Sequence, residues 1–313
     1  MNIEGKDFLL LAALAAAATP SWGQAAGQAS SGTPSVASTP DLSGAWTHPY
    51  VGFELPLSGP GPVRNRSRLS AGPQAGVGDG RQLVGDYTNP ILKPQAAEIV
   101  KQHGEISVTG VTYPTPLNQC WPQPLPYVFQ TPAMWMLQQP NQITIFYAPD
   151  HEVRQVRLNQ PHPARVTPSW SGDSVGHYEG DELVIDTVGI KADRPFAMVD
   201  TYGTPYTEAL HVVERYRLID YEAAEEAQNR ARKEHGYIPL NDSGLSVDPN
   251  YKGKGLQLQF TVEDDGVFTM PWSATVTYRR SVNDWFEYVC AENTHKYNTE
   301  KDAAVPTADK PDF

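Results

Sequence analysis

The chain of 313 residues contains 28 prolines, 25 glycines and only 19% charged residues, which favours a loop-rich β protein over a helical bundle. This length allows one large β domain or two small ones. The formal net charge of -12 at pH 7 argues against nucleic acid and anionic membrane surfaces as partners, so we expect neither.

The N-terminus has the pattern of a bacterial signal peptide. Residues 9–18 are all Leu or Ala, a run too short to span a bilayer, and Ala25 and Ala26 lie near a suitable cleavage point. We therefore predict a signal peptide over residues 1–25, a flexible tether over residues 26–40, and a periplasmic or secreted protein. Because one Lys stands against two acidic residues before the run, an irregular cytoplasmic leader is the alternative. No later segment is apolar enough to cross a membrane.

The first half of the folded part contains a strand, a loop and a helix. Gly44 and Trp46 form a Gly-x-Trp pattern that predicts a first strand whose indole closes one end of a small barrel. Residues 51–90 have no sustained periodicity and predict a long surface loop over a barrel end. Residues 94–103 predict a helix with proline at its start, and Gly104 is expected to end it.

Residues 134–137 predict a strand, and residues 141–190 after it predict an antiparallel β-sheet with a polar, titratable face. Strands are expected from Met134, over residues 143–147 and 151–158, and over residues 175–178 and 182–188, with a hairpin turn at residues 179–181. The segment holds His151, His162 and His177 together with several carboxylates.

A period of two places two charged residues inside the predicted barrel. Arg154 shares a strand face with Val156 and Leu158, and Glu214 shares one with Val212. Because an unpaired buried charge costs several kcal/mol or more, we predict that Arg154 and Glu214 form an ion pair.

The second half of the chain combines a helix with clear strands. Residues 220–235 predict an exposed helix whose mixed charges form a solvated face, within an insertion that extends to about residue 254. Residues 256–263 and 272–279 alternate cleanly between apolar and polar side chains and predict two strands. The barrel domain is expected over residues 41–295, and residues 296–313 are expected to form a surface tail.

Cys120 and Cys290 are the two cysteines of the chain. In an oxidising compartment they would pair as a disulfide and constrain the unfolded chain across a long loop. Two buried free thiols are the alternative, and the spacing fits no zinc motif.

Several segments together resemble a family of uncharacterised exported bacterial proteins with a lipocalin-like (calycin) β-barrel, over most of residues 41–290. The resemblance implies the fold and export, but no reaction. The helix of residues 220–235 departs from the shorter members and offers an oligomer contact or a lid. The matching segments are residues 41–46, 150–154, 161–163, 168–170, 176–189 and 211–216.

Motifs for several kinds of chemistry are missing from the sequence. The histidines His151, His162, His177 and His211 lack a compact metal-binding spacing, so we expect no metal. No Gly-x-Ser-x-Gly elbow, dinucleotide fingerprint or phosphate-binding loop occurs, so we expect neither a catalytic triad nor a nucleotide cofactor.

The remaining enzymatic option is cofactor-independent acid–base chemistry inside the barrel. Glu214 would act as the base, Arg154 would orient it or bind an oxyanion, and His177 would shuttle the proton, with His151 and Asp186 as reserves. The reaction would be a lyase, isomerase or hydratase step on a small apolar or aromatic molecule. For each residue, an ordinary structural role is the alternative.

Two hypotheses without turnover use the same fold. A lipocalin-like carrier would hold a hydrophobic ligand in its cavity, whereas a structural envelope protein would have a filled barrel. In either ligand-binding case, the residues expected to contact the ligand are Trp135, Met136, Tyr147, Trp170 and Tyr216.

Overall fold

The computed structural model describes residues 39–50, 52–66, 83–109, 113–148, 152–235, 246–282 and 289–290. The predicted signal peptide, most of the tether and the C-terminal tail lie outside these residues. His151 also lies outside them, as do residues 285–288, for which the sequence predicts a further strand that ends at Val289.

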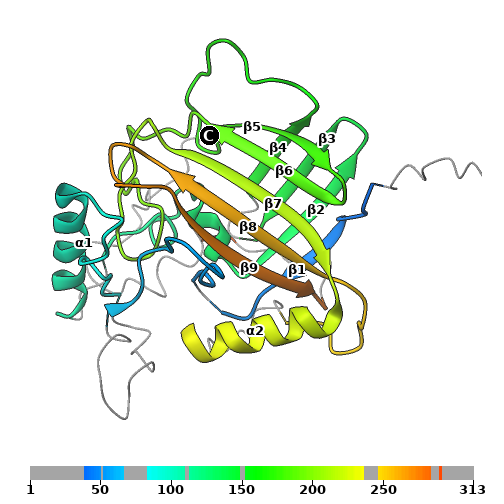
Figure 1. Ribbon diagram of the computed structural model, residues 1–313. Helices are drawn as coiled ribbons and strands as arrows, with labels where there is room; N and C mark the ends of the chain where they lie inside the picture. Colours follow the sequence, from blue (N-terminus) through cyan, green and yellow to red (C-terminus); the bar gives the residue numbers. More distant parts are fainter. Residues whose placement is uncertain are drawn as a thin grey trace, which may run out of the picture. The chain divides into compact units, whose positions relative to one another are not determined.

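In the described part of the chain, nine strands close into one barrel (Figure 1). They follow one another in sequence order, and the last strand pairs with the first through Trp46 with Arg280 and Thr47 with Arg279. This confirms the prediction of a mainly β barrel. The strands are β1 (Gly44–Thr47), β2 (Ala133–Gln139), β3 (Gln142–Tyr147), β4 (Glu152–Leu158), β5 (Asp173–Glu179), β6 (Glu182–Val188), β7 (His211–Ile219), β8 (Gly255–Glu263) and β9 (Trp272–Arg280).

One pair of strands departs from the antiparallel pattern that the sequence predicted. β4 and β5 run parallel, with Val156 opposite Ser174 and Leu158 opposite Gly176, whereas the other described pairs are antiparallel. Parallel neighbours need a crossover of roughly a dozen residues or more, and residues 159–172 provide it. The crossover therefore returns the chain to the end of the barrel where β4 begins.

Alternation along the strands lines the inside of the barrel with apolar side chains. Inward positions on every strand except β5 carry residues of the main core cluster, and all of them are buried. They include Trp46, Met134, Met136, Ile143, Ile145, Val156, Leu158, Leu183, Ile185, Val212, Tyr216, Leu256, Leu258, Phe260, Ala274, Val276 and Tyr278.

The Gly-x-Trp pattern has the role that the sequence predicted. Trp46 is fully buried, and the Arg280 guanidinium lies 4.2 Å above its ring. Gly44 has a φ of 128°, and a Cβ at this position would overlap the Arg280 guanidinium. Glycine is therefore needed here both for its backbone conformation and for the close approach of Arg280.

Helix α1 (Pro94–Ser107) begins at the predicted proline but continues past Gly104. The expected end at Gly104 was wrong, because this glycine lies inside the helix and allows a close contact with a residue outside it. A Cβ on Gly104 would lie 3.0 Å from Val84 Cγ1, so the missing side chain lets the residues around Val84 approach the helix.

Helix α2 (Tyr221–His235) lies along the outside of the barrel and packs on β8 and β9 (Figure 1). The prediction of a helix was correct, but the helix is exposed on one face only. Ala224, Ala227 and Ala231 are buried, and Gln228 Nε2 donates to the carbonyl oxygens of Thr47 (3.0 Å) and Thr277 (2.9 Å). Small side chains thus let this charged helix lie close to the barrel wall.

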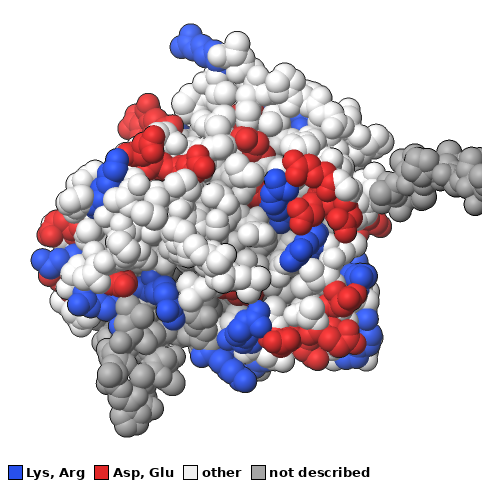
Figure 2. All heavy atoms as spheres, viewed as in Figure 1, with Lys and Arg blue, Asp and Glu red and all other residues white. Residues whose placement is uncertain are grey.

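Figure 2 shows acidic and basic side chains intermixed on the face in view, which includes α2. Among the described residues, no helix has both the length and the apolar character needed to cross a bilayer.

Candidate functional site

Arg154 of β4 and Glu214 of β7 meet inside the barrel, as the alternation predicted. Their side chains are 2% and 0% exposed. Arg154 Nη2 donates to Glu214 Oε1 at 2.6 Å, and Nη1 donates to Oε2 at 2.9 Å. This bidentate geometry is the strongest form of an arginine–carboxylate pair.

Four further side chains complete the interior network, which we define as Tyr147, Arg154, Ser174, Thr187, Glu214 and Tyr216. Arg154 Nε donates to Ser174 Oγ (3.0 Å), Nη2 to Thr187 Oγ1 (2.6 Å) and Nη1 to the Tyr147 hydroxyl (3.4 Å). The Tyr216 hydroxyl donates to Glu214 Oε2 (2.9 Å). Every N–H group of the guanidinium therefore has an acceptor, which offsets its removal from water.

Electrostatics within the network keep the guanidinium charged and the tyrosines neutral. Burial by itself would lower the pKa of Arg154, but the Glu214 carboxylate outweighs it and raises that pKa above its ordinary value. Burial raises the pKa of Tyr147 to about 12, although Arg154 opposes this shift. Burial, reinforced by Glu214, also raises the pKa of Tyr216 and Tyr278. At neutral pH these phenols are therefore hydrogen-bond donors.

Sequence reasoning did not identify Ser174 and Thr187 as members of this network. Thr187 lies two residues after Ile185 on the inward face of β6, so the alternation already contained the signal. Ser174 lies on β5, where few apolar residues mark the inward face.

His177, the predicted proton shuttle, does not lie with Arg154 and Glu214. Its side chain is 51% exposed on the outer face of β5, and its Nε2 lies 3.0 Å from Glu179 Oε1. The inward positions of this strand are Ser174, Gly176 and Tyr178.

Asp186, a reserve candidate, also lies on the outer face, where it joins what we call the outer His–Asp chain. His162 Nε2 and His211 Nε2 both lie 3.1 Å from Asp186 Oδ1. The other imidazole nitrogens face Asp173 Oδ1 (2.6 Å) and Glu263 Oε2 (3.5 Å). The chain consists of Arg157, Asp173, His162, Asp186, His211 and Glu263.

Hydrogen bonding sets the protonation of this outer chain. The hydrogen bond with Asp186 raises the pKa of His211, and the same contact lowers the pKa of Asp186. Arg157 lowers the pKa of Asp173 through a bidentate contact of 2.7 and 3.0 Å. No group of three or more His, Cys, Asp or Glu among the described residues is arranged to hold a metal ion.

The predicted ligand-contacting residues divide between the inside and the outside of the barrel. Met136, Tyr147 and Tyr216 are buried members of the main core. Trp135 points to the other face of β2, where it packs with Ala45, Ala133 and Ala148. Trp170 lies outside the strands altogether, in the crossover between β4 and β5. Trp135 and Trp170, which were predicted to contact a ligand, therefore do not lie in the main core of the barrel.

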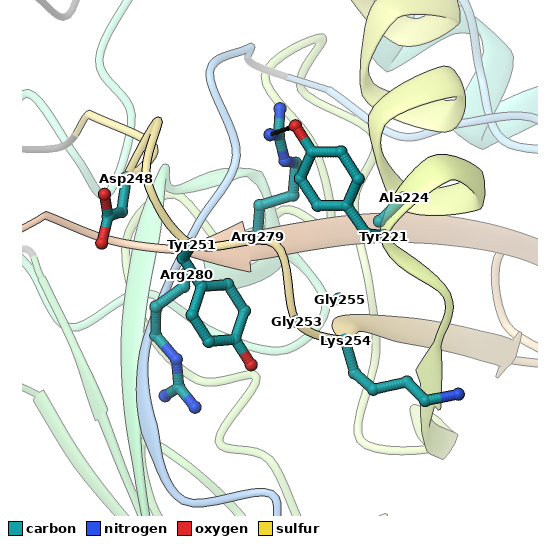
Figure 3. Close-up of a pocket in the computed structure, with 9 residues that line it drawn as sticks. All are labelled: Tyr221, Ala224, Asp248, Tyr251, Gly253, Lys254, Gly255, Arg279 and Arg280. Atoms are coloured by element: carbon teal, nitrogen blue, oxygen red, sulfur yellow. Dashed lines mark hydrogen bonds between the residues drawn. The ribbon is translucent and has the colours of Figure 1, made fainter.

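A narrow pocket lies outside the barrel, where the start of α2 faces the end of β9 (Figure 3). Arg279 donates to the Tyr221 hydroxyl at 2.8 Å across it. The pocket is too narrow to enclose a small molecule. It contains none of the predicted site residues, and its lining is Tyr221, Ala224, Asp248, Tyr251, Gly253, Lys254, Gly255, Arg279 and Arg280.

Cys120 and Cys290 form the predicted disulfide. Fold and network together define a closed β-barrel with a hydrogen-bonded ion pair in its interior. Comparisons of the chain with family models, with curated proteins and with solved structures gave no match.

Proposed function

We propose that this chain is an exported barrel protein that binds a small apolar or aromatic molecule beside the interior network. The observation that carries the proposal is the bidentate Arg154–Glu214 pair, enclosed with two tyrosine hydroxyls in an otherwise apolar barrel. Hydrophobic side chains of similar volume often stabilise a core as well as a buried ion pair does. The pair therefore supports a role beyond stability.

The ligand would contact apolar and amphipathic side chains next to the network. Tyr147, Tyr216 and Met136 are buried around it and combine apolar surface with hydroxyl donors. Such a site, mostly apolar with a few fixed polar groups, is typical of small-molecule binding.

Binding is better supported than the acid–base reaction considered from the sequence. All the N–H groups of Arg154 already have acceptors, so binding an oxyanion would break an existing hydrogen bond. Both oxygens of Glu214 accept from Arg154, which disfavours proton abstraction by this carboxylate.

Export is supported by the signal-peptide pattern and by the disulfide, which persists in oxidising compartments. Native mass spectrometry of protein purified from its own periplasm provides a direct test, because a co-purifying molecule would define the ligand class.

A binding experiment with variants tests the site itself. The neutral aromatic probe N-phenyl-1-naphthylamine is titrated against wild type and against the double variant Arg154→Met/Glu214→Leu, which removes both charges. We expect the double variant to remain folded and to change affinity for the probe at least tenfold. The control Arg215→Met/Glu182→Leu removes an ion pair from the outer face and should leave affinity unchanged. Equal affinity of the interior variant and wild type would contradict the proposal.

A further inference from the structure

Trp170 lies in the crossover between β4 and β5, in a cluster of aromatic and basic side chains that shares no residue with the interior network. We define the Trp170 cluster as Trp121, Trp170, Lys191, Arg194 and Phe196. The Trp121 ring is 5.7 Å from that of Trp170 and 6.4 Å from that of Phe196, in edge-to-face arrangements. The Arg194 guanidinium lies 4.3 Å from the Trp170 ring centre, and Lys191 Nζ lies 5.3 Å from it. Two cations therefore contact one indole.

The guanidinium of Arg194 has hydrogen-bond donors that lack well-formed partners. Its Nη2 donates to the carbonyl oxygen of Pro122 at 2.6 Å, while its Nε and Nη1 are enclosed and, within the described part of the chain, have only the Tyr206 hydroxyl as a weak, poorly aligned acceptor. Burial lowers the pKa of Arg194, and neighbouring Tyr206 and Glu152 only partly oppose that shift. Among the described residues, neither Arg194 nor Lys191 forms an ion pair.

The cluster is tied to the end of the barrel nearest the interior network. The Gln123 backbone N–H, two residues after Trp121, donates to Glu152 Oε1 at 2.6 Å. Glu152 begins β4 and lies two residues before Arg154, so both project from the same strand face. On the other side of the cluster, the core residue Tyr206 donates from its hydroxyl to the Lys191 carbonyl at 2.9 Å.

We propose that the Trp170 cluster recognises the carboxylate of an aromatic acid and that Arg194 and Lys191 supply the charge. This goes beyond the proposed function, because the Trp170 cluster lies outside the strands and forms a site separate from the barrel interior. Trp121, Trp170 and Phe196 offer faces and edges for an aromatic ring, and the two cations lie beside them. The nearby Glu152 carboxylate carries one negative charge and already accepts a hydrogen bond from the Gln123 backbone. The two cations therefore leave a net positive charge for the carboxylate of a ligand.

The test compares two probes of equal ring size by calorimetry: 1-naphthoate, which carries a carboxylate, and 1-naphthalenemethanol, which does not. Wild type should bind 1-naphthoate at least tenfold more tightly than the alcohol. Arg194→Gln should remove this preference while leaving the affinity for the alcohol within twofold. The matched control Arg215→Gln changes an exposed arginine that pairs with Glu179, and should preserve the preference.

Arg194→Lys serves as a second variant should the glutamine variant fold poorly, and it should retain part of the preference because it keeps the charge. If the alcohol binds and 1-naphthoate binds no more tightly, the carboxylate proposal is overturned while the proposed function stands. A preference that survives in Arg194→Gln also overturns it. Binding of neither probe likewise overturns it, whereas the proposed function is tested separately with N-phenyl-1-naphthylamine.

Discussion

Removing one partner of the interior ion pair should cost far more stability than removing both. In Arg154→Met, Glu214 keeps one described donor, the Tyr216 hydroxyl at 2.9 Å, while its side chain remains 0% exposed. Leaving a buried charge without its partner typically costs about 3–5 kcal/mol, so we expect a loss of that size in the free energy of unfolding.

The double variant Arg154→Met/Glu214→Leu also removes the buried Glu214 charge that the single variant leaves without its partner. Ser174 and Thr187 keep the 3.0 Å hydrogen bond between their hydroxyls. The buried hydroxyls of Tyr147 and Tyr216 lose their contacts with the pair, which costs about 1 kcal/mol or more for each. We expect its stability to lie within about 2 kcal/mol of wild type, because hydrophobic replacements of buried ion pairs are often neutral or stabilising. The two substitutions should thus be strongly non-additive.

Urea denaturation followed by circular dichroism measures these differences. Arg215→Met, in which the arginine is 40% exposed, is the control and should change stability by less than about 1 kcal/mol. A double variant as unstable as Arg154→Met, or a single variant as stable as wild type, would refute the reasoning.

Two further predictions concern the outer face and the closed end of the barrel. The raised pKa of His211 contributes stability below the ordinary histidine pKa of 6.5 and is lost as pH rises; the lowered pKa of Asp186 contributes stability above the ordinary pKa of 3.8 and is lost as pH falls. The stability advantage of wild type over His211→Gln should therefore be greatest between these values in urea titrations across pH, and a pH-independent advantage would contradict this. Gly44→Ala should destabilise the fold by about 1–3 kcal/mol more than Gly180→Ala in thermal melts, because both glycines have positive φ but only Gly44 faces the Arg280 guanidinium; equal losses would count against the role of this contact.

The interior pair could be predicted because it depends on a local rule. Side chains alternate along a strand, and Val156 and Leu158 mark the inward face of β4, so Arg154 had to follow them. Glu214 was found in the same way from Val212. The prediction needed no knowledge of which strands are neighbours.

The same rule failed where both faces of a strand carry similar residues. In β2, Met134, Trp135 and Met136 are all large and apolar, so their order does not show which of them faces the core. In β5, Gly176 and Tyr178 mark the inward face only weakly, so the alternation did not show that His177 faces outward.

Other features depend on contacts between distant parts of the chain. The outer His–Asp chain exists because the parallel crossover brings His162 to Asp173 and Asp186. Gly104, inside α1, packs closely against Val84, which lies about ten residues before the helix begins. Neither arrangement has a signature in local sequence.

The disulfide also determines how the barrel would respond to mechanical force. Cys120 and Cys290 are 170 residues apart, and their bond encloses every described strand except β1. At about 3.4 Å per residue, roughly 58 nm of chain is thereby shielded from extension. Pulling on the two ends of the protein would therefore peel β1 from β2 and β9 and open a lateral seam, while the other strands stayed within one covalent ring.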